Sequence, residues 1–169
     1  MKTKLSIYLL SSLALVFAMT PSNLEAQSQE TKKPIKYKKA RALQTSTAKK
    51  MAKVYEALEE VDESGEPAPD METVLTILTE LRNKKDELKS YDRSVMWNAW
   101  AYVYFSDAKY AQAIDAYTNL INEPEVTIGL RVGALLSLAQ LNLVQENYEK
   151  GIELILQWMS EVEKVTAQS

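Results

Sequence analysis

The stretch SVMWNAWAYVYFSDAKYAQAIDAY, residues 94–117, carries two tryptophans, four tyrosines and one phenylalanine. Trp97, Trp100 and Tyr104 recur at spacings of three and four residues, which places them on one face of a helix. A break at 106–108 separates them from a second helical stretch, and so short a break requires an antiparallel helix pair. We expect the aromatic face to form the interior of this pair, since large rings bury much apolar area. A cofactor pocket or a carbohydrate platform is the less favoured alternative.

Apolar residues recur at helical spacing on both sides of this stretch, and the pattern predicts six helices. The expected ranges are 46–62, 71–84, 93–106, 109–121, 127–144 and 147–164. The residues that open the second helix of each pair, Met71, Tyr110 and Tyr148, are 39 and 38 residues apart. Near-constant spacing of helix hairpins indicates stacked units that bury their apolar faces against one another. The predicted fold is therefore an all-α solenoid of about three antiparallel hairpins over residues 42–169.

The expected core positions of the first hairpin follow from the same helical spacing. They are Met51, Val54, Tyr55, Leu58 and Val61 in its first helix and Val74, Leu75, Leu78 and Leu81 in its second. The segment DESGEPAPD, with Gly65, Pro67 and Pro69, ends the first helix. Asp70 can cap the second helix.

Composition excludes several kinds of active site. The chain has no cysteine and no histidine, so thiol nucleophiles, Ser-His-Asp triads and zinc sites built on these residues are excluded. Four scattered glycines form no phosphate-binding loop, and no cofactor is expected. An enzyme would have to use paired carboxylates. The candidates are Glu59, Glu60 and Asp62, or Glu161 and Glu163, and a solvated helix surface is the strongly preferred interpretation of both sets.

Residues 1–26 have the layout of a secretory signal peptide. Lys2 and Lys4 precede an apolar run from Leu5 to Ala18, which is short for a permanent membrane anchor. Cleavage is expected after Ala26, with Ala18 as the second choice, and a buried N-terminal helix is the alternative. The sequence therefore predicts an exported protein.

A basic arm is expected at residues 27–41, ahead of the helical domain. It contains Lys32, Lys33, Lys36, Lys38, Lys39 and Arg41 against a single acidic residue, Glu30. The arm could contact an anionic membrane surface or an acidic partner, or it could be a solvated leader, which is favoured. Nucleic acid is not an expected partner, because the rest of the exported chain is acidic.

The opening stretch resembles a tetratricopeptide repeat (TPR). Its matching residues are Trp97, Trp100-Ala101, Tyr104, Tyr110, Ala113 and Tyr117. A weaker match follows at Leu135, Leu138-Ala139, Tyr148, Gly151 and Ile155, and another precedes it at Ala48, Met51-Ala52, Tyr55, Val74 and Leu78. The resemblance implies a non-enzymatic protein–protein interaction module.

More narrowly, the chain resembles periplasmic TPR proteins that accompany TonB systems in marine gamma-proteobacteria. The stretches that carry this resemblance are KKDELKSYDRSVMWNAWAYVYFS, YAQAIDAYTNLINEPEVTIGLRVGALLSLAQL and QENYEKGIELILQWM. It implies a periplasmic accessory of TonB and its ExbB and ExbD partners. The alternative is a general envelope scaffold that an uncleaved leader anchors, with no link to TonB.

The family resemblance also implies where a partner binds, because TPR proteins hold extended peptides on the first helices of their hairpins. The matching positions are Lys49, Lys53 and Glu56, then Asn98, Tyr102 and Phe105, then Leu136, Gln140 and Leu143. Asn98, Tyr102, Phe105 and Gln140 are the expected partner-binding residues among them. Tyr102 and Phe105 could instead pack within the stack, and a basic set for gripping a C-terminal carboxylate is absent.

The last helix has two apolar stripes. Tyr148, Ile152, Ile155, Met159 and Val162 are expected to face inward, and Leu154, Trp158 and Val165 are expected on another face. A terminal solenoid helix is normally polar outside. Leu154 and Trp158 are therefore predicted to bind a partner, a second copy or a further repeat.

Overall fold

The computed structural model describes residues 41–167. Its helices are α2 (Thr45–Leu58), α3 (Met71–Asn83), α4 (Ser90–Ser106), α5 (Tyr110–Ile121), α6 (Ile128–Val144) and α7 (Tyr148–Ala167), with a short 3₁₀ helix, η2 (Lys85–Glu87). No strand occurs in this range, so the all-α prediction is confirmed. The expected signal peptide, 1–26, and residues 27–40 of the basic arm lie outside the described residues.

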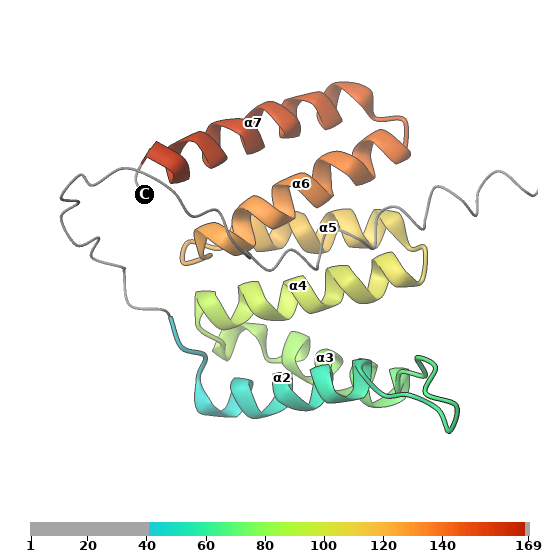
Figure 1. The fold of residues 1–169 in the computed structure, drawn as a ribbon. Coiled ribbons are helices and arrows are strands. Elements are labelled where there is room, and N and C mark those ends of the chain that lie inside the picture. The colour runs from blue at the N-terminus through green and yellow to red at the C-terminus, as the bar shows by residue number, and fades with distance from the viewer. Residues whose placement is uncertain (1–40, 168–169) are drawn as a thin grey trace, which may run out of the picture. The chain divides into compact units, whose positions relative to one another are not determined.

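Consecutive helices pack side by side, and the chain reverses direction at each connection (Figure 1). The main contacts join α2 to α3, α4 to α5, α5 to α6 and α6 to α7, while α4 also touches α3 and α6. Each helix is short enough to be marginal alone in water, so these lateral contacts must supply most of the stability.

The α4–α5 and α6–α7 connections have the same local structure. Ala108 and Glu146 both adopt the left-handed region, with φ of 54° and 62°. In each turn the next amide donates to a carbonyl five residues back, Lys109 to Tyr104 and Asn147 to Asn142, both at 2.8 Å. This is a Schellman motif, which satisfies the last carbonyls of a helix and turns the chain sharply back.

Two clusters of buried apolar side chains hold the helices together. The larger joins α2, α3, α4 and part of α5 and includes Met51, Val54, Val74, Leu78, Met96, Trp100 and Ala116. The smaller consists of Leu135, Leu138 and Ala139 of α6 with Leu154 of α7. Tyr117 of α5 packs against both clusters and so links them.

Three of the aromatic side chains of α4, Trp97, Trp100 and Tyr104, fill the space between helices, as predicted. Trp100 is 3% exposed, and its Nε1 donates to the Leu78 carbonyl of α3 at 3.2 Å. Tyr104 stacks on the Trp100 ring at 5.0 Å, and the Arg82 guanidinium lies 4.4 Å from that ring. Trp97, Tyr104 and Tyr117 are partly buried against the larger cluster. Trp100 is therefore part of the core rather than an open platform.

Burial recurs at matching positions along the three first helices. A shift of 49 residues aligns α2 with α4, and a further shift of 38 aligns α4 with α6. Under these shifts Met51 is equivalent to Trp100 and to Leu138, and all three are buried. The same shifts align Val54, Val103 and Leu141, also buried. On the second helices, shifts of 39 and 38 align Leu81, Leu120 and Trp158. The three hairpins therefore present equivalent positions to their neighbours.

Three residues expected in the core of the first hairpin are exposed. Tyr55 is 44% exposed, and Leu75 and Val61 are also open to solvent. Val61 follows the end of α2 and forms an isolated bridge with Pro67 in the connection to α3. Tyr55 lies on the side of α2 that has no preceding helix in the described range. The core predictions at these three positions were therefore wrong: within the described residues no helix covers that side of α2, and Val61 lies in the connection rather than on the helix.

Candidate partner-binding surface

The predicted binding positions lie at equivalent places on α2, α4 and α6, and together they define the first-helix surface. The shifts of 49 and 38 residues align Lys49 with Asn98 and Leu136, Lys53 with Tyr102 and Gln140, and Glu56 with Phe105 and Leu143. Because the three helices are equivalent members of successive hairpins, these side chains stand on the same side of each helix.

Tyr102 is the most open of the aromatic side chains on α4. It is 51% exposed, although its chain neighbours Ala101 and Val103 are both buried. Asn98, one turn earlier, is half-buried. A half-exposed tyrosine beside an amide can supply apolar area and a hydroxyl to a partner at a low cost in side-chain entropy. Tyr102 is therefore the centre of the first-helix surface.

Phe105 contributes less to this surface than expected. It is half-buried, and its ring lies 6.1 Å from the ring of Tyr110 across the α4–α5 turn. This contact is the packing alternative that the sequence left open. A change at Phe105 would therefore disturb the turn as well as the surface.

The flanking parts of the surface differ in character. On α2, Lys49, Lys53 and Glu56 are exposed and charged. On α6, Gln140 is half-buried, and so are Leu136 and Leu143. The surface therefore runs from a charged end on α2, through an aromatic and amide centre on α4, to a less polar end on α6.

Polar contacts fix the N-terminal ends of α2 and α4. Asp92, a buried carboxylate of α4, accepts from the backbone amide of Gln44 at 2.9 Å, so it holds the start of α2. Arg93 grips Glu123 with two hydrogen bonds of 2.7 and 2.8 Å. Hydrogen bonding to Glu123 raises the pKa of Arg93. Arg41 at the end of the basic arm pairs with Glu125 at 3.0 Å.

The faces of α7 differ in part from those predicted: Ile155 packs against the smaller cluster as expected, but Tyr148, Ile152 and Met159 do not face inward. Leu154 is 3% exposed and belongs to the smaller cluster, and Trp158 packs against it. The outward side chains are instead Tyr148, Ile152, Leu156 and Met159. Gly151 explains the orientation, because the absence of a side chain lets that face of α7 approach Leu143 of α6 closely. The expectation that Leu154 and Trp158 offer an exposed apolar face was wrong.

The paired carboxylates do not form a shared cleft. Asp62 accepts hydrogen bonds from Ser64 and Glu66 in the loop after α2, which lowers its pKa. Glu161 pairs with Arg131 at 3.6 Å, and Glu163 is exposed. Neither set lines a recess described below. In residues 41–167 no three acidic side chains are placed to hold a metal ion.

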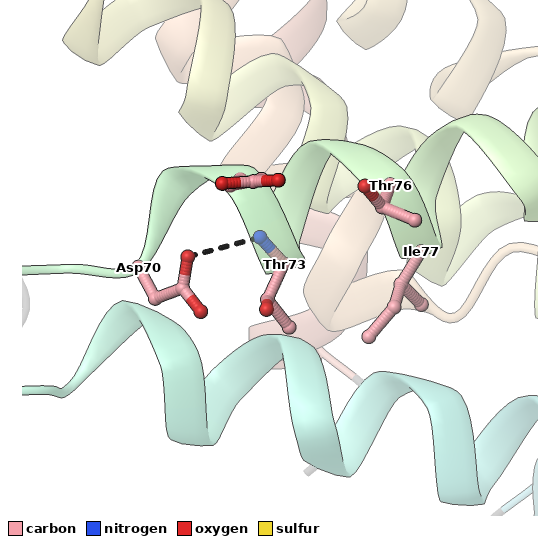
Figure 2. A pocket seen from close by; sticks show the side chains of 5 residues that line it. Asp70, Thr73, Thr76 and Ile77 are labelled. Atoms are coloured by element: carbon pink, nitrogen blue, oxygen red, sulfur yellow. Dashed lines mark hydrogen bonds between the residues drawn. The ribbon is translucent and has the colours of Figure 1, made fainter.

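The described surface includes two recesses that the helices form. One of about 210 Å³ lies at the start of α3, beside Glu72, Thr76 and Ile77. There the Asp70 carboxylate accepts from the Thr73 amide at 3.0 Å, as expected for a helix cap (Figure 2).

The second recess, of about 300 Å³, is a groove between α5, α6 and α7. It is lined by Ile114, Ile121, Leu138 and Leu154, with Arg131 and Lys150 among its polar members. Arg131 is held by the Ile121 carbonyl and Glu161, and Lys150 pairs with Glu153. The basic groups of the groove are thus already engaged within the chain.

Comparisons with known proteins add no relative: no family model, curated protein or solved structure matches this chain. Within the described residues, no helix is both long and apolar enough to cross a membrane.

Proposed function

We propose that the protein is a non-enzymatic, TPR-like interaction module that binds a protein or peptide on the first-helix surface. The observation that carries the proposal is the exposure of Tyr102 at a position equivalent to Lys53 and Gln140. A stack of hairpins that presents equivalent positions in series offers an extended peptide repeated contacts. The buried state of Trp100 supports the proposal, because it leaves surface side chains for recognition.

The narrower proposal concerns place and partner. The signal-peptide layout of residues 1–26 supports export to the periplasm. The resemblance to periplasmic TPR proteins supports a role beside TonB, ExbB and ExbD. The competing proposal is a general envelope scaffold that an uncleaved leader anchors. N-terminal sequencing of the exported protein separates the two, because an anchored scaffold retains residues 1–26.

The test of the binding surface is capture from an envelope extract with the immobilised protein. Tyr102→Ala removes the exposed ring, Tyr102→Phe keeps it, and Gln112→Ala changes an exposed residue of α5 outside the surface. We expect Tyr102→Ala to lose at least tenfold in recovered partner, while the other two variants retain it. A loss of tenfold corresponds to about 1.4 kcal/mol, within the range of a tyrosine hot spot.

The identity of the captured proteins decides between the narrower proposals. Recovery of TonB, ExbB or ExbD in a Tyr102-dependent manner supports the uptake role. Tyr102-dependent recovery of other envelope proteins alone keeps the interaction module and discards the TonB link. Equal recovery on all four proteins, wild type included, contradicts the first-helix surface as the binding site.

A further inference from the structure

The outer side of α7 carries an apolar row made of Tyr148, Ile152 and Met159, here called the α7 row. These side chains are 59%, 55% and 55% exposed. They repeat at intervals of four and seven residues, so they form one continuous strip along the helix. Exposed apolar side chains in a contiguous strip mark a surface that another element covers.

Inside the stack, the equivalent strip is covered. A shift of 38 residues aligns Ile152 with Ile114 and Met159 with Ile121 on α5. Both α5 residues pack against the cluster formed by Leu135, Leu138 and Ala139 of α6. The α7 row is therefore a second copy of the surface with which α5 receives the next hairpin.

At the N-terminal end of the described residues, α2 carries the opposite half of this interface. The α2 row consists of Ala48, which is half-buried, and of Ala52 and Tyr55, which are exposed. Ala52 is exposed, whereas its equivalents Ala101 and Ala139 are both 0% exposed. The equivalent of Tyr55 on α4 is Tyr104, whose hydroxyl accepts a hydrogen bond from Arg82 of α3 at 2.9 Å. The α2 row is thus the surface with which a hairpin meets the one before it.

We propose that the α2 row of one copy docks on the α7 row of a second copy of this chain, head to tail. The joint would be equivalent in position to the α3–α4 and α5–α6 interfaces, where residues at the matching positions pack against each other within one chain. Within the chain, Tyr104 of α4 contacts Arg82 of α3. Tyr55 is the equivalent of Tyr104, and Met159 is the equivalent of Arg82. The proposed joint therefore places Tyr55 of one copy beside Met159 of the next.

The net charges of α2 and α7 favour this arrangement over pairing of two α7 helices. The α2 helix has three lysines against one glutamate, whereas α7 has four glutamates against two lysines. Opposite charge attracts the two different ends and disfavours like ends. A head-to-tail contact is heterologous, so assembly continues by adding copies unless the rotation closes a ring.

Sedimentation of the purified protein over a range of concentrations tests the proposal. We expect the average mass to rise above that of a monomer as concentration increases. Ile152→Glu should abolish the rise. Leu156→Glu is the matched control, because Leu156 is also exposed on α7 but its equivalent, Thr118, stays exposed inside the stack. A mass that stays monomeric throughout, or equal effects of both substitutions, overturns the proposal.

Thiol cross-linking tests the orientation, and the absence of native cysteine makes introduced thiols unique. A short bismaleimide should join Tyr55→Cys protein to Met159→Cys protein when the two are mixed, and neither protein to itself. Ser160 is exposed beside the α7 row. Ser160→Cys protein should therefore cross-link to Tyr55→Cys protein less efficiently than Met159→Cys protein does. Efficient linking of Met159→Cys to itself shows that α7 pairs with α7 and overturns the head-to-tail joint. Tyr102 lies outside both rows, so this failure would leave the proposed binding surface standing.

Discussion

Gly151 of α7 lies directly against Leu143 of α6: a methyl group on Gly151 would stand 2.6 Å from Leu143 Cδ2 and 3.3 Å from the Ala139 carbonyl oxygen. A glycine in a helix interior normally costs stability, because the unfolded chain loses more freedom on folding. Here the missing side chain sets the spacing of the α6–α7 hairpin. The close approach is what turns Leu154 and Trp158 toward the core.

Gly151→Ala is therefore expected to destabilise the protein by about 1–3 kcal/mol, the usual cost of overpacking. That cost exceeds the gain of about 1 kcal/mol from better helix propensity. Gly133→Ala on α6 is the control, because a methyl group there meets nothing within 4 Å. We expect it to stabilise the protein by about 0.5–1 kcal/mol. Urea unfolding of the two variants measures both effects, and equal shifts of the same sign would contradict the close-packing argument.

The two Schellman turns give a second prediction. Ala108 and Glu146 have left-handed backbones, which cost a residue with a Cβ about 1 kcal/mol and cost glycine almost nothing. We expect Ala108→Gly and Glu146→Gly each to stabilise the protein by up to about 1 kcal/mol, because the relief of strain exceeds the entropy cost. Ala111→Gly, on the exposed side of α5, should instead destabilise by about 1 kcal/mol. Thermal unfolding compares the three, and a loss at Ala108 would argue against the left-handed turn.

The helices were predictable because their signals are local. Apolar spacing places α4 and α5, and Pro67, Pro69 and Pro124 interrupt the chain between helices. The six expected ranges agree with the observed helices to within a few residues. The interior position of Trp100 also follows from spacing alone, since its neighbours one turn away are apolar.

The covered faces of α2 and α7 were not predictable from apolar spacing. On α7, the side chains of the outward row are as apolar as those of the inward face, so the larger stripe was assigned inward. Gly151 held the missing signal: it aligns with Ala113 of α5, a buried small residue, and so marks the side that packs. At α2, Tyr55 is exposed, whereas its equivalent Tyr104 stacks on Trp100 and accepts a hydrogen bond from Arg82. The face of such a helix that is buried depends on the helix packed against it, and the apolar spacing of the helix itself does not reveal that partner.

Thr47 provides a third prediction. It is 1% exposed, and within the described residues its Oγ1 has no hydrogen-bond partner. Its equivalents, Met96 and Ala134, are buried apolar residues. A buried hydroxyl without a partner costs about 1–3 kcal/mol, so Thr47→Val should stabilise the protein by about 1 kcal/mol at nearly constant shape.

Thr47→Ser is the matched variant for this test. It keeps the hydroxyl and removes the buried methyl, so it should destabilise the protein by about 1 kcal/mol. Urea denaturation at one pH compares both variants with the wild type. If Thr47→Val is the destabilising change, the hydroxyl makes a hydrogen bond in solution and the argument fails.

Lowering the pH into the acid range should destabilise the protein. Changing it between about pH 5 and about pH 9 should have little effect on stability. With no histidine and no cysteine, no side chain of ordinary pKa titrates between about pH 5 and about pH 9. Asp62, Asp70 and Glu80 all have lowered pKa values. The hydroxyl and amide of Ser64 stabilise the Asp62 carboxylate, Thr73 stabilises that of Asp70, and Lys50 that of Glu80.

A lowered folded-state pKa means that the unfolded chain binds protons first as the pH falls. The contribution of these carboxylates to stability is therefore complete above their unfolded pKa values, near about 4, and is lost as the pH drops through the lower folded values. Asp70→Asn keeps an oxygen to accept from Thr73 but cannot titrate, so it should show a shallower loss of stability below about pH 4. Denaturant midpoints measured from about pH 2 to about pH 7 test this. Asp86→Asn, at an exposed carboxylate of η2, serves as the control, and an equal change in acid slope for both variants would contradict a special role for the Asp70 cap.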